Sequence, residues 1–449
     1  MAWERKISRT VRVRNEQTIG QLARLLSVIS EAGGGLGDIH LLTETSRHVV
    51  RDIVIYADSL EQMENILEAI RAIPGSKVMD VRDEVLELHQ KGKIAVRARY
   101  PVDSLATLRR VYTPGVAEVC LKIARDPSLA RLYTSTSHMV AIVTDGTAVL
   151  GLGDIGPLAG MPVMEGKAML METLVGLSGV PILLDTRDPD RIVETVAAIA
   201  PTFAAIQLED ISAPRCFDIE ERLQQRLDIP VMHDDQHGTA VVTTAALMVA
   251  SRQTGVYLSV AKIGQIGLGA AGFATARMLM RLTGNPVWGA DLNPEALKRL
   301  EKAGGRPSTL REIMANCDIV IATTGAAGLI QPEMVRRGQI ILALSNPNPE
   351  IDPETALAQG ALFAADGKSV NNLLGFPGIF RGAVDAHAPR ITHEMLLAAA
   401  QTIANLTPPG ELVPNPLDKK VHLAVARAVA QKAIDQGLAR AEYVPYVEE

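Results

Sequence analysis

The sequence predicts an α/β protein of three parts: an N-terminal β-α-β-β-α-β domain, a second α/β domain, and a third domain built as a doubly wound parallel sheet. Three observations lead to this prediction. The first 85 residues alternate between strand-like and helix-like apolar patterns, two later strands each end in a pair of carboxylates, and a glycine-rich turn joins a strand to a helix near residue 270. The predicted domains are residues 1–85, 86–238 and 239–449, and the last of them is expected to end in a mostly helical region over residues 385–449.

The composition is that of a globular protein and excludes several classes of partner. With 449 residues, the chain is too long for one hydrophobic core. A net charge of −6 leaves no basic surface, so we expect neither nucleic acid nor membrane as a partner. Cys120, Cys216 and Cys317 are widely spaced and fit a reducing compartment. The charged N-terminus lacks the apolar core of a signal peptide, and we therefore expect a cytoplasmic protein.

The N-terminal domain is predicted from its alternation of periods. Strands are expected over residues 7–14, 37–45, 49–57 and 77–81, and helices over 17–32 and 59–73. This order is the split βαβ arrangement. With the turn at residues 15–20, it resembles an ACT domain, a small-ligand regulatory module; a non-binding oligomerisation module is the alternative. The resemblance implies a small-molecule effector near Gly20 and a homo-oligomer. A charged helix over residues 83–99 is expected to connect this domain to the next.

A glycine-rich loop over residues 144–167 is expected to deliver Lys167 to a functional site, because long loops in compact domains are usually functional. Its segment Gly151-Leu-Gly-Asp-Ile-Gly156 formally matches the dinucleotide fingerprint. Prolines at 157 and 162 follow where a phosphate-binding helix should begin, so we interpret this match as false. We expect a helix over residues 168–177, and both a helix start and burial favour a neutral, basic lysine. The alternative is a solvated helix lysine.

Two predicted strands, over residues 204–208 and 229–232, each end in acidic residues. Ligands of open α/β sheets bind at the carboxyl ends of the strands. Four converging carboxylates would repel one another without a cation, so we predict a Mg²⁺ or Mn²⁺ site. His233 and His237 flank the second pair on an expected loop, and we interpret them as structural. The four carboxylates are Glu209, Asp210, Asp234 and Asp235.

A second glycine motif has the context that the first one lacks. A strand over residues 263–266 leads into Gly267-Leu-Gly269-Ala270-Ala271-Gly272 and a helix over 273–282, and the next strand ends in Asp291. This pattern predicts a Rossmann-type domain that binds NAD, with the pyrophosphate at the helix start. Asp291 would bind the ribose hydroxyl of NAD and repel the phosphate of NADP. We therefore expect NAD to be the cofactor in preference to NADP. Thr324 follows the next strand and is a further candidate for the cofactor.

Seven motifs in order resemble those of a bacterial malic enzyme, from about residue 95 to 400. The motifs are Tyr112-Thr-Pro-Gly, Leu150-Gly-Leu-Gly-Asp, Met164-Glu-Gly-Lys167, Leu208-Glu-Asp-Ile211, His233-Asp-Asp-Gln-His-Gly-Thr239, Leu344-Ser-Asn-Pro347 and Asn371-Asn372. The resemblance implies oxidative decarboxylation of (S)-malate to pyruvate and CO₂ with NAD(P)⁺ and Mg²⁺ or Mn²⁺, the reaction of an NAD-dependent, oxaloacetate-decarboxylating malate dehydrogenase.

The same resemblance implies a role for each matching residue. The metal ligands look like Glu209, Asp210 and Asp235; the catalytic residues look like Tyr112, Lys167 and Asp234; and the substrate-binding residues look like Asn346, Asn371 and Asn372. Lys167 would take the proton from the malate hydroxyl, Asp234 would orient it, and Tyr112 would return a proton to enolpyruvate. Ala148 stands where larger relatives have a substrate-binding arginine, which leaves the partner of the distal carboxylate open.

Two other functions stay open at this point. A malolactic-type or oxaloacetate decarboxylase of the same family would keep all these residues. A ligand sensor with a degenerate enzyme body would have lost a catalytic group, and none of those named above is missing.

Overall fold

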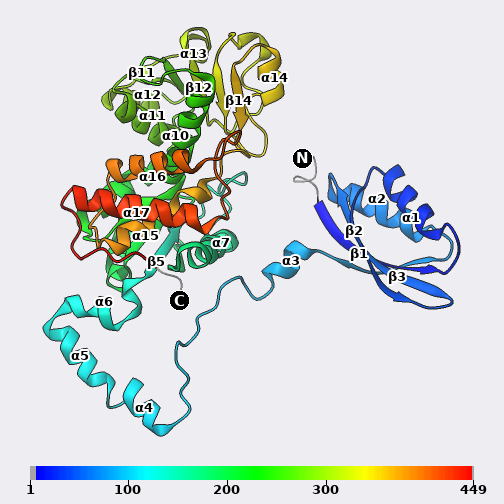
Figure 1. Cartoon of the computed structure of the whole chain (residues 1–449), viewed down its shortest axis with the longest axis horizontal. Helices are drawn as coiled ribbons and strands as arrows, with labels where there is room; N and C mark the ends of the chain where they lie inside the picture. Colours follow the sequence, from blue (N-terminus) through cyan, green and yellow to red (C-terminus); the bar gives the residue numbers. More distant parts are fainter. Residues whose placement is uncertain (1–6, 447–449) are drawn as a thin grey trace. The chain divides into compact units, whose positions relative to one another are not determined.

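The computed structural model describes residues 7–446, which divide into two compact units at Ala95 and Val96 (Figure 1). The units are described separately. Both parallel sheets belong to the second unit, and the predicted boundary at residue 238 falls inside a helix, Asp234–Thr254. The three-domain division therefore stays a prediction.

The first unit has the predicted β-α-β-β-α-β order. Its elements are β1 (Ile7–Glu16), α1 (Gln21–Glu31), β2 (Gly35–Glu44), β3 (His48–Ala57), α2 (Leu60–Arg71) and β4 (Ser76–Arg82). The antiparallel sheet has the order β2-β3-β1-β4, and Figure 1 shows both helices on one face of it. Val11, Val13, Leu25, Ile53 and Ile66 are buried between helices and sheet, so alternate residues of the strands form the core.

The predicted connecting helix is wrong over most of its length. Only α3 (Glu84–His89) forms, capped by the side chain of Asp83. Lys91 and Gly92 then adopt positive φ angles of 67° and 80°, which no helix continues through.

The second unit contains a four-stranded parallel sheet in the order β6-β5-β7-β8. Its strands are β5 (Met139–Thr144), β6 (Ser178–Leu183), β7 (Ala205–Leu208) and β8 (Val231–His233). Helices α7 (Pro157–Val175), α8 (Pro189–Ile199) and α9 (Arg215–Arg226) connect them. Because β5, β7 and β8 are almost wholly buried, most of their residues are apolar, although β7 also buries Gln207 and β8 ends in His233.

Helix α7 corrects the prediction for the glycine-rich loop. We expected a helix start after Gly166, but the helix begins at Pro157 and includes Pro162. Proline suits the first helical position, and burial of Met164 and Met171 stabilises the rest of the helix despite its poor propensity. Lys167 therefore lies within the helix, on its buried side, and not at its start.

A six-stranded parallel sheet forms the other half of this unit, in the order β11-β10-β9-β12-β13-β14. This is the strand order of a Rossmann-type doubly wound sheet, as predicted. Its strands are β9 (Ile263–Ile266), β10 (Trp288–Ala290), β11 (Arg306–Pro307), β12 (Ile319–Ala322), β13 (Ile340–Ala343) and β14 (Phe363–Asp366). The crossovers include α11 (Ala270–Thr283), α12 (Pro294–Lys302), α13 (Leu310–Asn316) and α14 (Pro353–Ala358).

Four further helices pack together beside the two sheets. They are α10 (Asp234–Thr254), α15 (Phe376–Asp385), α16 (His393–Leu406) and α17 (Lys419–Asp435). The helical C-terminal region was predicted, whereas the loop expected after residue 233 is wrong, because α10 begins at Asp234. Within residues 7–446, no helix combines the length and the apolar character needed to span a bilayer.

Three short helices precede the first parallel sheet: α4 (Leu105–Val111), α5 (Val116–Arg125) and α6 (Ala130–Tyr133) (cyan in Figure 1). None of them contains a buried residue. Several of their large apolar side chains are exposed, namely Leu105, Leu108, Val111, Leu121 and Leu132.

Candidate active site

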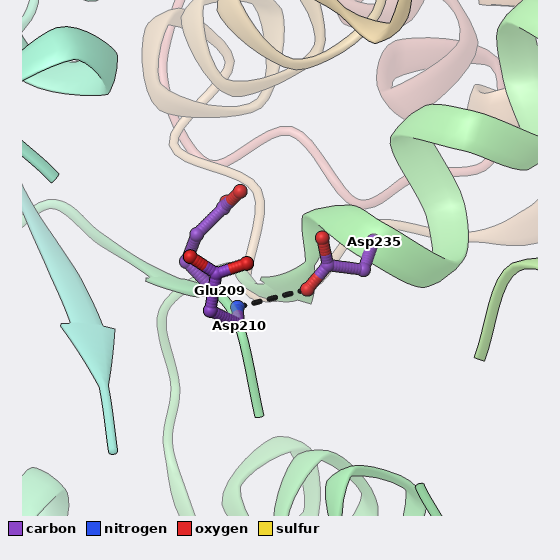
Figure 2. Close-up of side chains that lie close together, drawn as sticks. All are labelled: Glu209, Asp210 and Asp235. Carbon is purple, nitrogen blue, oxygen red and sulfur yellow. Dashed lines mark hydrogen bonds between the residues drawn. The ribbon is translucent and has the colours of Figure 1, made fainter. Parts of the chain in front are cut away.

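Three carboxylates meet where β7 and β8 end (Figure 2). Glu209 and Asp210 directly follow β7, and Asp235 lies in the first turn of α10 after β8. One oxygen from each lies within 4.8 Å of the others, and the backbone N–H of Asp210 donates to Oδ2 of Asp235 over 2.8 Å. Three of the four carboxylates predicted to converge at the carboxyl edge are therefore brought together, whereas the fourth, Asp234, contacts Lys167.

Asp210 is held by its backbone as well as by its neighbours. Its φ is +53°, and its carbonyl oxygen accepts hydrogen bonds from the backbone N–H groups of Thr147 and Ala148. Burial and the charge of Asp235 raise the pKa of Asp210 to about 7. Its Oδ2 is buried without a hydrogen-bond partner, which is a costly state for a carboxylate that lacks a cation.

Lys167 reaches the same site from α7. Its ammonium contacts Asp234 and lies 3.0 Å from Oε1 of Glu209. Burial lowers the pKa of Lys167, but the two carboxylates outweigh burial and raise it above its ordinary value. We expected a neutral lysine from a helix start and burial alone, and that expectation is wrong for this arrangement of charges. Burial in turn raises the pKa of Asp234.

A phenylalanine and an asparagine complete the surroundings of Lys167. The ammonium lies 4.4 Å from the centre of the Phe376 ring, at the start of α15. Nδ2 of Asn372 donates to Oδ2 of Asp234 over 3.4 Å. Asn371 instead caps the short turn that follows it, and Asn346 lies beside Gly367 after β13. Of the three predicted asparagines, only Asn372 contacts the lysine–carboxylate group through a described bond.

Tyr112 lies in a different setting. It caps the end of α4, its side chain is 65% exposed, and no described hydrogen bond or ion pair links that side chain to Lys167. The next helix, α5, begins at Val116.

The loop between β9 and α11 has the shape that the second glycine motif predicts. Gly267 has φ +85°, and a Cβ on Gly272 would lie 1.9 Å from the carbonyl oxygen of Gly267, so both positions require glycine. A Cβ on Gly269 would meet nothing within 4 Å, which leaves open space in front of the loop. The backbone N–H groups of Ala270 and Ala271 are at the free N-terminus of α11.

Asp291 follows β10 beside this loop. Its Oδ2 accepts a hydrogen bond from the backbone N–H of Leu268 over 2.7 Å, which fixes its carboxylate at the glycine turn. Lys298, the nearest basic residue downstream of Asp291 in sequence, is ion-paired with Glu295 at 2.8 Å. Thr324 donates to the buried carboxylate of Glu350, from its hydroxyl and from its backbone N–H.

Comparisons with known proteins identify the family. The model for the malic enzyme N-terminal domain matches residues 91–224, and the model for the malic enzyme NAD-binding domain matches residues 293–434. The chain is 54% identical to NAD-dependent malic enzyme 1 of Bacillus subtilis over 428 residues, which cover 95% of this chain and 98% of the relative.

The chain belongs to the malic enzyme family. It is 43% identical to the bifunctional malic/malolactic enzyme of Bacillus subtilis, over 81% of this chain and 95% of that one. The crystal structure of the malic enzyme from Pyrococcus horikoshii is similar with a TM-score of 0.76 and 41% identity, over 80% of this chain and 92% of that one. Both family models leave residues 1–90 unmatched.

A hard divalent cation fits the acidic groups of this malic enzyme chain. Carboxylate oxygens are the ligands that Mg²⁺ and Mn²⁺ prefer, and the unpartnered Oδ2 of Asp210 would gain a partner from such an ion. The dinucleotide loop likewise fits NAD, because the space before Gly269 is open and Asp291 stands beside it.

Two residues of the malic enzyme site were missed in the sequence. Glu220 of α9 is buried and accepts hydrogen bonds from the backbone N–H of His233 and from Gln236, and it contacts Nε2 of His237 at 3.0 Å. This agrees with the interpretation of both histidines as structural. The sequence does contain one indication of the role of Glu220, namely that a charged residue lies within the apolar stripe of α9. Phe376 gave no signal, since nothing in its local sequence indicates a lysine above its ring.

Proposed function

We propose that this protein is an NAD-dependent malic enzyme, which converts (S)-malate to pyruvate and CO₂. The observation that carries the proposal is the buried contact of Lys167 with Asp234 and Glu209, directly beside the three-carboxylate cluster. A lysine, its orienting aspartate and a cation site are the groups that oxidation of a 2-hydroxy acid requires.

Lys167 is the proposed base for the first step. It would accept the proton of the C2 hydroxyl as the hydride leaves C2, and Asp234 would orient its amino group. Glu209 is shared between two roles. Without a bound cation, the carboxylate of Glu209 stabilises the ammonium of Lys167. When Glu209 serves as a ligand of a cation, its charge is neutralised, and Asp234 is then the one charged carboxylate of the described residues in contact with Lys167.

Glu209, Asp210 and Asp235 are the proposed ligands of Mg²⁺ or Mn²⁺, and Gly267, Gly269 and Gly272 are proposed to approach NAD. When bound, the cation would supply positive charge beside the C2 oxygen, and NAD⁺ would supply the hydride acceptor. Asp291 is proposed to accept a hydrogen bond from the adenosine ribose.

Decarboxylation follows oxidation in this scheme. The C3–C4 bond breaks, CO₂ leaves, and the resulting enol of pyruvate needs a proton at C3. Tyr112 is the proposed donor, and the amides of Asn346, Asn371 and Asn372 are proposed to bind the carboxylate and hydroxyl groups of malate.

The test is an assay of the whole chain with malate, either cofactor and Mn²⁺. NADH, pyruvate and CO₂ should form in equal amounts, and a chelator should stop the reaction. NAD⁺ should give the higher kcat/KM, because Asp291 repels a 2′-phosphate and Lys298 is already paired with Glu295. An equal or higher value with NADP⁺ would contradict this role of Asp291.

A second candidate is a malolactic reaction, in which lactate is the product and no free NADH appears. It is favoured by the 43% identity to the bifunctional malic/malolactic enzyme. Lactate and NADH measured in the same reaction separate the two functions.

We also propose that the N-terminal unit is an ACT-like regulatory module and that the protein is a homo-oligomer. The four-stranded sheet with two helices on one face supports the first proposal, and the exposed apolar residues of α4, α5 and α6 support the second. Coupling between a regulatory and an active site is typically about 1–3 kcal/mol. A chain beginning near Lys93, compared with the full chain for oligomer size, malate KM and thermal shifts with amino acids and central metabolites, tests both. Unchanged kinetics and oligomer, with no ligand for the full chain, would refute them.

A further inference from the structure

A basic cavity of about 830 Å³ lies between α9, α11 and α12. We call it the α11–α12 cavity. Its charged lining residues are the cations Arg277, Arg281, Arg299 and Lys302 and the single carboxylate Glu221. None of the residues proposed above for metal, substrate or dinucleotide lines this cavity. Such a concentration of positive charge stands out in a chain whose net charge is −6.

Arg299 is held in the cavity wall without forming an ion pair. Its guanidinium lies 4.3 Å from the centre of the Phe217 ring and 4.9 Å from that of Phe273. Nη2 donates to the carbonyl oxygen of Leu268 over 3.0 Å, while Nε is buried without a hydrogen-bond partner. Among residues 7–446, no carboxylate forms an ion pair with Arg299 or with Arg277.

Arg277 is the second partly buried cation that forms no ion pair with a carboxylate. Nη2 lies 3.0 Å from Nε2 of His393, and burial lowers the pKa of that histidine to about 4, so the ring is a neutral acceptor. Arg281 has only a partly exposed ion pair with Glu394, at 3.3 Å. Partly buried guanidinium groups without an anion carry a desolvation cost that an anionic ligand would offset.

We propose that the α11–α12 cavity binds a small effector with at least two negative charges, carried on phosphate or carboxylate groups. The planar guanidinium fork binds both groups in a bidentate manner, and the volume suits a metabolite-sized ligand. The inference goes beyond the proposed function, because binding here requires neither malate nor a metal.

Contacts lead from this cavity to the active site. The rings of His393 and His237 lie 6.4 Å apart, and His237 contacts Glu220 at 3.0 Å. Glu220 in turn accepts from the backbone of His233, which precedes Asp234. A ligand that moves Arg277 therefore acts on the start of α10, and we expect it to change the KM of malate or NAD⁺.

The test is calorimetric titration of the metal-free full chain with pyrophosphate and, separately, with citrate, with and without saturating NAD⁺. We expect one site that NAD⁺ does not block and that weakens as KCl is raised. Arg277→Gln and Arg299→Gln should each weaken binding roughly tenfold or more, as expected for a charge-assisted hydrogen bond. Lys298→Gln is the matched control, since Lys298 is exposed, paired with Glu295 and outside the cavity. The stronger of the two probes identifies phosphate or carboxylate as the preferred group.

Three results would overturn the proposal: no binding of either probe at millimolar concentration, competition with NAD⁺, or an equal loss in Lys298→Gln. If the buried arginine variants fail to fold, the double variant Arg281→Gln/Lys302→Gln replaces them. Both side chains are at the surface, and the double variant should also bind more weakly than the control. Because binding is measured without metal or malate, its failure is independent of the proposed reaction.

Discussion

Lys167 and Tyr112, the two proposed proton-transfer residues, have opposite environments. Lys167 is 9% exposed and contacts two buried carboxylates and an aromatic ring. Tyr112 is 65% exposed and ends a helix without buried residues. The fold of the described chain thus determines the position and the charge of Lys167, whereas only local backbone contacts hold Tyr112. Substitution of Lys167 should therefore lower stability and metal affinity as well as activity, whereas substitution of Tyr112 should affect activity and leave stability almost unchanged.

The largest effect is expected from Lys167→Ala. NADH formation should fall by about 10²–10⁴-fold, the usual contribution of a general base. The variant should also lose stability, by about 3–5 kcal/mol, because Asp234 and Glu209 would remain buried without their cation. Stopped-flow absorbance and denaturant unfolding measure the two effects. Lys298→Ala serves as the control, and a near-normal NADH rate in Lys167→Ala would disprove its role as the base.

The carboxylate cluster should show the next largest effect. Mn²⁺ is expected to stabilise the wild type by about 2.7 kcal/mol at a concentration 100 times its Kd. Asp235→Asn should lose most of this stabilisation, because its oxygen is one of the three within 4.8 Å. Asp190→Asn, at an exposed aspartate paired with Arg222, should keep it. Thermal unfolding measured with Mn²⁺ and with chelator tests this prediction. If Mn²⁺ raises the melting temperature equally in both variants, the ion binds elsewhere.

Tyr112→Phe should separate the two proton transfers. Exchange of deuterium from solvent into C3 of pyruvate should fall by about 10²-fold, while the hydride step is largely kept. Since Tyr112 is exposed, the free energy of unfolding of the variant should differ from that of the wild type by less than about 0.5 kcal/mol. Tyr133→Phe, at another exposed tyrosine, is the control. A large loss of stability in Tyr112→Phe would mean that the tyrosine is packed in solution and would remove the contrast with Lys167.

The smallest effect is expected in the pH dependence of stability, which the partly buried His393 contributes to. Burial lowers the pKa of His393 from 6.5 to about 4, so the unfolded chain binds more protons than the folded one between these values. Stability contributed by the neutral ring is complete above about pH 6.5 and is lost as the pH falls towards 4. His393→Asn should flatten this part of the curve of unfolding free energy against pH. An unchanged slope would show that other groups cause it.

Much of this fold could be predicted because its signals are local. The strands that became β5, β7 and β9 are short, mostly apolar segments, with Gln207 in β7 and Gln265 in β9, and the glycines after β9 fix a turn that only glycine allows. The convergence of Glu209, Asp210 and Asp235 followed from a geometric rule, since parallel strands end at one edge of a sheet. None of these predictions required knowledge of a distant side chain.

The connecting helix failed for a local reason, the positive φ angles of Lys91 and Gly92, whereas the failed predictions around Lys167 depended on tertiary contacts. Helix α7 begins at Pro157 because its buried residues stabilise it against its own proline and glycines. The protonation of Lys167 is governed by Asp234, 67 positions later in the chain, and by Glu209. The pKa shift expected from helix position and burial alone therefore had the wrong sign. Phe376 could not be predicted either, as it meets Lys167 only in the folded chain.

The positive φ of Asp210 limits which amino acids this position accepts. At +53°, an L-residue other than glycine pays a steric cost that aspartate and asparagine tolerate best. A glutamate would keep the charge but strain the backbone, a glycine would relax the backbone but remove the ligand oxygen, and an asparagine would keep the backbone but lose the charge. Comparing these three variants would separate the conformational from the electrostatic demands on a single residue. Few alternatives to aspartate are therefore open to natural sequence drift at this position.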